Sequence, residues 1–62
     1  MILVIGTTDG GQFSQMCRTV ERADEWMRRM AETSFRDIVW QTYEVEATDV
    51  NGAIREITRR AQ

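Results

Sequence analysis

Two glycines near the start of the chain have the spacing of a phosphate-binding loop. Gly6 and Gly11 follow a short apolar run in a G-x-x-x-x-G pattern. In a P-loop the next residues are a lysine, which contacts the phosphates, and a serine or threonine, whose hydroxyl binds magnesium. Here those positions hold Gln12 and Phe13. We therefore interpret Asp9–Gly11 as the turn of a β-hairpin, because such turns use the positive φ angles that glycine adopts readily.

Groups for covalent or acid–base catalysis are few. Cys17 is the single cysteine, and the chain has no histidine to activate its thiol. Glu44 and Glu46 would be neighbours on one strand face, but such charges commonly serve to prevent aggregation at a strand edge. One thiol with scattered carboxylates does not make a zinc site. We expect no enzyme activity, no cofactor and no metal, and we interpret Cys17 as a small buried apolar residue.

The charge balance gives an alternative function. All eight basic residues are arginine, and ten acidic residues bring the net charge to −2. This acidic balance provides no broad positive field for nucleic acid. A local group of arginines beside stacking aromatic rings could still bind a single strand. The candidates for nucleic-acid contacts are Arg18, Arg36, Arg55, Arg59 and Arg60, with Trp40 or Tyr43 as stacking surfaces.

Two segments resemble parts of known kinds of protein. Arg18–Trp26 resembles the strand-to-helix passage of the arm-type DNA-binding domains of phage integrases, which implies a three-stranded sheet with a helix and DNA binding. Tyr43–Asp49, followed by Gly52–Ile54, resembles the strand-to-helix ending of small bacteriophage proteins. With the all-arginine basic set, this second resemblance implies a bacteriophage accessory protein that acts in the host cytoplasm by binding a host protein.

The apolar pattern predicts three strands. Residues 2–5 are apolar at every position, which is typical of a central strand buried on both faces. Residues 13–20 fit a strand or a helical stripe, and we favour the strand because a hairpin turn precedes them. Residues 38–47 are rich in β-branched and aromatic side chains, so they predict a third strand.

Two segments have the period of an amphipathic helix. Residues 21–33 form the first, with Trp26 at the edge of its apolar stripe. Thr48 or Asp49 would cap the second. The two stripes consist of Ala23, Met27, Met30 and Ala31, and of Val50, Ala53, Ile54, Ile57 and Ala61.

These elements predict one small α+β domain over residues 1–62, in the order β-β-α-β-α. The hairpin makes the first two strands antiparallel, and a right-handed crossover brings the third beside the first. The antiparallel sheet then has the strand order 2-1-3. We expect both helices on one face, over Val39, Tyr43 and Val45, so that the other face stays open.

The open face would be the interaction surface. A chain of 62 residues buries only ~60% of its unfolded surface, and a second subunit is a common remedy. We therefore expect a small acidic cytoplasmic protein that binds proteins, as a homodimer or on a host protein, with no membrane partner. If the register of the third strand were shifted by one residue, Trp40 would belong to the core. The candidate interface residues are Ile38, Trp40, Thr42, Phe13 and Cys17.

Overall fold

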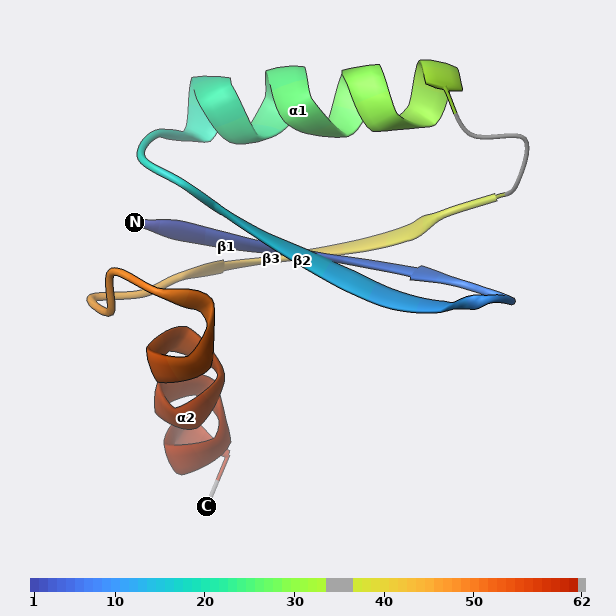
Figure 1. The fold of residues 1–62 in the computed structure, drawn as a ribbon. Helices are drawn as coiled ribbons and strands as arrows, with labels where there is room; N and C mark the ends of the chain where they lie inside the picture. Colours follow the sequence, from blue (N-terminus) through green and yellow to red (C-terminus); the bar gives the residue numbers. More distant parts are fainter. Residues whose placement is uncertain (34–36, 62) are drawn as a thin grey trace.

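A computed structural model describes residues 1–33 and 37–61, and it confirms the predicted order of elements (Figure 1). The elements are β1 (Ile2–Thr8), β2 (Gly11–Cys17), α1 (Val20–Thr33), β3 (Val39–Glu44) and α2 (Val50–Arg60). The ambiguous segment 13–20 is a strand up to Cys17, and the helix begins at Val20. The strand interpretation is therefore correct.

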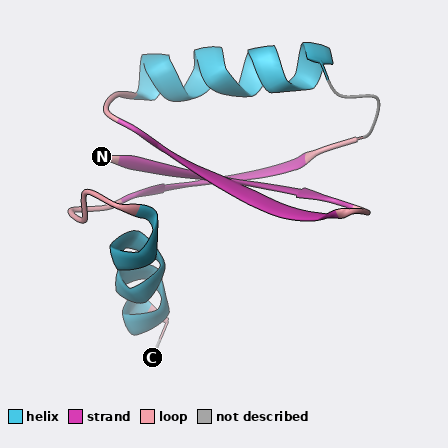
Figure 2. Ribbon diagram, viewed as in Figure 1, coloured by secondary structure: helices cyan, strands magenta, loops and turns pink. Residues whose placement is uncertain are grey.

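The three strands form one antiparallel sheet in the order β2-β1-β3, which confirms the predicted topology (Figure 2). Residues 2–7 of β1 have a partner on both sides; Val4, for example, lies between Gln15 and Thr42. Beyond β3 the ladder gains one more pair, because the backbones of Met1 and Val45 exchange two hydrogen bonds of 3.0 and 2.9 Å. The most apolar strand is thus the central one.

The hairpin turn differs from the prediction in its backbone angles. Thr8 pairs with Gly11, so Asp9 and Gly10 connect the strands. Among the described residues only Gly11 has a positive φ, of 132°. The hydroxyl of Thr8 accepts a hydrogen bond from the N–H of Gly10 at 3.1 Å and donates one to the carbonyl of Gly11 at 3.2 Å. The left-handed conformation is therefore needed at the first residue of β2 and not within the turn.

The two helices lie on opposite faces of the sheet, which corrects the prediction that they share one (Figure 1). We call these the α1 face and the α2 face. On the α1 face Val4 and Cys17 pack with Ala23 of α1. On the α2 face Leu3 and Val45 pack with Ala53 of α2. The alternating side chains of β1 therefore contribute to two separate cores, and each core requires its own helix.

Each helix begins at a side chain that caps its first turn. The hydroxyl of Thr19 accepts a hydrogen bond from the N–H of Arg22 at 3.1 Å. The side chain of Asp49 accepts a hydrogen bond from the N–H of Gly52 at 3.0 Å. Of the two predicted caps, Thr48 and Asp49, the second is therefore the one that caps α2. In both helices the predicted stripe was too wide, because Ala31, Ile54 and Ala61 are exposed.

Candidate protein-binding site

The predicted open face is covered by α1, so the premise of the candidate interface is wrong. Phe13, Trp40 and Cys17 do share the α1 face, but Trp26 of α1 packs over it. The rings of Phe13, Trp26 and Trp40 form a triangle with centroids 5.6–5.8 Å apart and edge-to-face contacts. Trp40 therefore packs in the core of the α1 face, as in the alternative, but no shift in register is involved, because Tyr43 and Val45 pack on the opposite face. Of the other two candidates, Ile38 is half-buried and Thr42 is exposed.

Cys17 lies at the inner end of β2, where only 7% of the residue is exposed. Burial raises the pKa of its thiol, and the nearby guanidinium of Arg22 opposes that rise only in part. A raised pKa disfavours the thiolate, which is the reactive form of cysteine. The environment thus agrees with the interpretation of Cys17 as a small apolar core residue.

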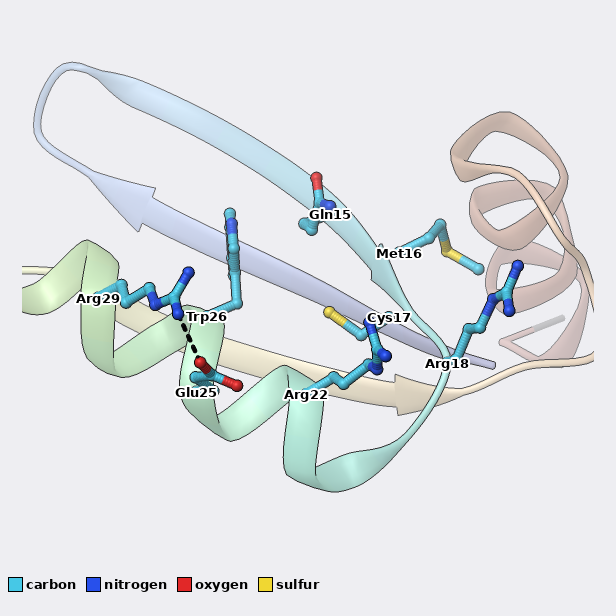
Figure 3. Close-up of a pocket in the computed structure, with 8 residues that line it drawn as sticks. All are labelled: Gln15, Met16, Cys17, Arg18, Arg22, Glu25, Trp26 and Arg29. Carbon is cyan, nitrogen blue, oxygen red and sulfur yellow. Dashed lines mark hydrogen bonds and ion pairs between the residues drawn. The ribbon is translucent and has the colours of Figure 1, made fainter.

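A groove of about 590 Å³ lies between β2 and α1 (Figure 3). Four residues of α1, spaced at i, i+3, i+4 and i+7, form its helical wall, so a single face of the helix overlooks the strand. The lining residues are Gln15, Met16, Cys17 and Arg18 from the β2 side and Arg22, Glu25, Trp26 and Arg29 from α1. We call this the arginine groove.

The charge of the arginine groove is opposite to that of the chain. Three arginines and one glutamate give the groove a formal charge of +2, whereas the chain carries −2. Arg29 forms an exposed ion pair with Glu25 at 2.6 Å. The side chains of Arg18 and Arg22 have no hydrogen-bond or ion-pair partner within residues 1–33 and 37–61. Two cationic groups therefore remain for an anionic ligand.

The arginines proposed for nucleic acid do not gather in one place. Arg18 lines the groove beside β2, while Arg55 and Arg59 lie on α2, on the other side of the sheet. Arg60 is already engaged by Glu56 and by the carbonyl of Glu44. Arg36 lies outside the described residues. Of the two candidate stacking residues, Trp40 belongs to the aromatic triangle and Tyr43 packs against the core of the α2 face, so the two rings lie on opposite faces of the sheet.

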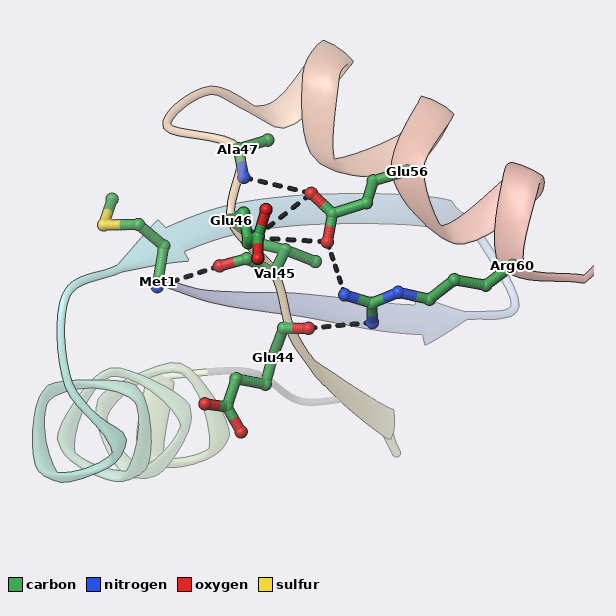
Figure 4. A network of polar contacts seen from close by, with 7 residues as sticks. All are labelled: Met1, Glu44, Val45, Glu46, Ala47, Glu56 and Arg60. Atoms are coloured by element: carbon green, nitrogen blue, oxygen red, sulfur yellow. Dashed lines mark hydrogen bonds and ion pairs between the residues drawn. The ribbon is translucent and has the colours of Figure 1, made fainter.

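A polar network joins α2 to the chain that leaves β3 (Figure 4). The carboxylate of Glu56 accepts hydrogen bonds from the backbone N–H groups of Glu46 and Ala47, each at 3.1 Å, and also pairs with Arg60. Arg60 in turn donates to the carbonyl of Glu44 at 2.9 Å. These contacts lower the pKa of Glu56, first through the N–H of Glu46 and then through Ala47 and Arg60.

We expect the substitution Glu56→Gln to lower the midpoint of thermal unfolding by a few degrees at neutral pH. The pKa of Glu56 is lower in the folded chain than in the unfolded one, so its stabilisation is complete above the unfolded pKa and is lost as the pH falls through the folded pKa. The difference between wild type and variant should therefore disappear in acid. Circular dichroism melts across a pH series would measure it.

The matched control is Glu25→Gln, because Glu25 is an exposed carboxylate with a single arginine partner. Its effect at neutral pH should be much smaller, as is usual for exposed ion pairs. An equal effect of the two substitutions, or a Glu56→Gln effect that persists in acid, would contradict the role of the backbone hydrogen bonds.

The two edges of the sheet differ in how their backbone groups are used. Because Met1 and Val45 form a hydrogen-bonded pair, odd-numbered residues of β1 bond to β3 and even-numbered ones to β2. On β2, Gln12, Ser14 and Met16 therefore direct their N–H and C=O groups away from the sheet. No other strand of the described chain pairs with that edge.

The edge of β3 is blocked at one end by side chains of α2, as the same alternation of backbone groups shows. Even-numbered residues of this strand and its extension point their backbone groups outward, and these include Glu44 and Glu46. Arg60 occupies the carbonyl of Glu44, and Glu56 occupies the N–H of Glu46. Helix α2 thus closes one end of the β3 edge, whereas no strand within residues 1–33 and 37–61 pairs with the β2 edge beside the arginine groove.

The α2 face is covered at one end only. Helix α2 lies beneath the end of the sheet that holds Met1, while the hairpin end extends beyond it (Figure 1). In the register of the sheet, the two rows of residues nearest the hairpin on this face carry no charge. They are Ile5, Thr7, Gln12, Ser14, Val39 and Gln41, and we call them the hairpin-end patch. Val39 is 65% exposed.

Sequence reasoning missed both surfaces. Arg22, Trp26 and Arg29 were detectable as one helical face, but only the position of α1 over β2 makes that face a groove wall. The sequence predicts Val39 in the core because both helices are expected on its face, but α2 leaves Val39 exposed. Of the predicted interface residues, Phe13, Cys17 and Trp40 lie instead beneath α1.

No protein-family model, curated protein or solved structure matches this chain. Within the described residues no helix has the length and apolar character needed to cross a membrane. The same residues contain no group of three or more histidine, cysteine, aspartate or glutamate side chains able to hold a metal ion.

Proposed function

We propose that this chain is a non-catalytic protein-binding module that associates with a second copy of itself through the hairpin-end patch. The observation that carries the proposal is the absence of charge from six neighbouring residues at the end of the sheet beyond α2, in a chain of which 29% of residues are charged. Ile5 packs against the α2-face core, and Gln12, Val39 and Gln41 are exposed. Depletion of charged side chains distinguishes the centre of a protein interface from the remaining surface.

The exposed area of the chain supports association. Its accessible surface is 4794 Å², whereas a compact monomer of 7.2 kDa has about 4100 Å² by the usual scaling with mass. The radius of gyration of 11.8 Å also exceeds the ~10.6 Å expected for this length. The molecule is flat, with a smallest extent of 14 Å. A flat shape exposes more surface than a compact one, so less apolar area is buried to stabilise the fold of a monomer.

Two copies would pack sheet against sheet. A two-fold axis through the patch places the same residues on both sides of the interface, so the uncharged surface meets itself without electrostatic repulsion. Face-to-face sheets pack about 10 Å apart through the side chains between them. The exposed Val39 supplies an apolar contact.

We expect the substitution Val39→Arg to weaken dimerisation by at least ~100-fold, because the axis would bring two unpaired cations together in the interface. The control is Val20→Arg, which adds the same charge at a valine of α1 that is 58% exposed. Molar mass by light scattering across a dilution series would measure the change, with circular dichroism to verify the fold. A wild-type chain that stays at 7.2 kDa at all concentrations would refute the proposal, as would dissociation caused by Val20→Arg alone.

The non-catalytic part of the proposal rests on Cys17, whose raised pKa disfavours nucleophilic chemistry. A bacteriophage origin, a host partner and a cytoplasmic location stay predictions from the sequence.

A further inference from the structure

We propose that the arginine groove binds an extended acidic peptide, which adds to the outer edge of β2 as a fourth strand. The proposal concerns a different surface from the hairpin-end patch, so the two stand or fall separately. Three observations support it: a free strand edge, a helical wall beside that edge, and a positive charge that the wall concentrates.

The strand edge provides the backbone contacts. Ser14 and Met16 each direct one N–H and one C=O group outward, and no other strand of the described chain pairs with them. An exposed edge of this kind is a template for an added strand, whose main-chain hydrogen bonds supply affinity. The β3 edge is a poorer site, since Glu56 and Arg60 occupy one of its ends.

The helical wall provides side-chain specificity. Arg22, Trp26 and Arg29 lie on the side of α1 that faces β2 (Figure 3). Side chains of an added strand alternate between the two faces of the sheet, so every second one would point toward this wall. Trp26 offers an apolar contact beside the strand, as in other grooves that receive a peptide between a helix and a strand edge.

The charge selects an acidic occupant. The side chains of Arg18 and Arg22 have no hydrogen-bond or ion-pair partner among the described residues, and Glu25 already has Arg29. A guanidinium binds a carboxylate through two parallel hydrogen bonds, which favours glutamate or aspartate over other side chains. The ligand is therefore an extended peptide with acidic residues at alternating positions.

The test measures fluorescence anisotropy of a labelled short peptide in which glutamate alternates with valine. We expect saturable binding that weakens as salt is added, because the contacts are charged and exposed. A peptide with lysine in place of glutamate should not bind. A glutamate peptide that is N-methylated on the edge facing β2 should also not bind, because it cannot donate to the strand. Equal binding of either control peptide would overturn the proposal.

The variant Arg22→Ala should lower affinity for the glutamate peptide by about tenfold, as expected for the loss of one charge-assisted hydrogen bond. The control is Arg28→Ala, which removes the same charge from α1 at an exposed position outside the groove. An equal loss of affinity in both variants would show that only the net charge of the protein matters, and it would refute the assignment of the peptide to the arginine groove. Absence of binding at every protein concentration would also refute it.

Discussion

Replacing Trp26 by alanine should lower the free energy of unfolding by about 3 kcal/mol, the lower end of the cost of removing a large aromatic side chain from a core, because Trp26 is half-buried. Trp26 is the only member of the aromatic triangle that comes from α1, and its ring contacts Phe13 at 5.8 Å and Trp40 at 5.7 Å between centroids. Both edge-to-face contacts would be lost together with the apolar area that the indole covers. Because a domain of this size rarely has more than ~3–5 kcal/mol of stability, the variant should be largely unfolded.

Urea denaturation followed by circular dichroism would measure this loss. The control is Trp26→Phe, which keeps an aromatic ring at the site and should recover about half of the difference or more. The alanine variant should therefore unfold at a lower urea concentration than the wild type. If both unfolded at the same urea concentration, the aromatic triangle would not stabilise the packing of α1, and the contacts of Ala23 and Met27 would be sufficient.

The strand order could be predicted because several local patterns agree on it. The uninterrupted apolar run in β1 requires a central position, and the Asp9–Gly11 turn fixes β2 beside it. The crossover through α1 then leaves β3 the other side of β1. Each inference uses residues close in sequence, where the physical determinants are local.

The apolar run in β1 also predicts one helix on each face of the sheet. The expectation of both helices on one face is inconsistent with this run. A strand that is apolar at every position needs cover on both faces. Leu3 and Val4 are each fully buried, and they point to opposite faces. Two helices on one face would have left Val4 exposed. Strand β3 likewise has a large aromatic residue on each face, Trp40 on one and Tyr43 on the other, which also indicates that both faces are covered.

The candidate surfaces could not be predicted from the sequence. The arginine groove depends on which edge of the sheet α1 overlooks, and the free edge of β2 depends on the alternation of hydrogen bonds set by Met1 and Val45. The exposure of Val39 depends on how far α2 reaches across the sheet. These are properties of tertiary placement, and no single segment encodes them.

Replacing Gly6 by alanine should destabilise the fold by about 2–3 kcal/mol, in the upper part of the usual range for overpacking a core. Gly6 lies between its cross-strand partners Phe13 and Trp40, and the ring of Phe13 covers it. An added Cβ would lie 2.4 Å from Cζ of that ring. Alanine is favoured over glycine within a strand by roughly 0.5–1 kcal/mol. The clash should exceed this gain, because Trp26 and Trp40 hold the ring from two sides.

A double-mutant cycle separates this steric cost from a backbone effect. In a Phe13→Leu background the ring is absent, so Gly6→Ala should cost at least ~1 kcal/mol less than in the wild type. Gly11→Ala is the matched comparison, because its Cβ would meet nothing within 4 Å and its cost comes from the positive φ of 132°. That cost should be the same in both backgrounds. If Phe13→Leu relieved both substitutions equally, or neither, the contact between Gly6 and the Phe13 ring would not be the reason for glycine at this position.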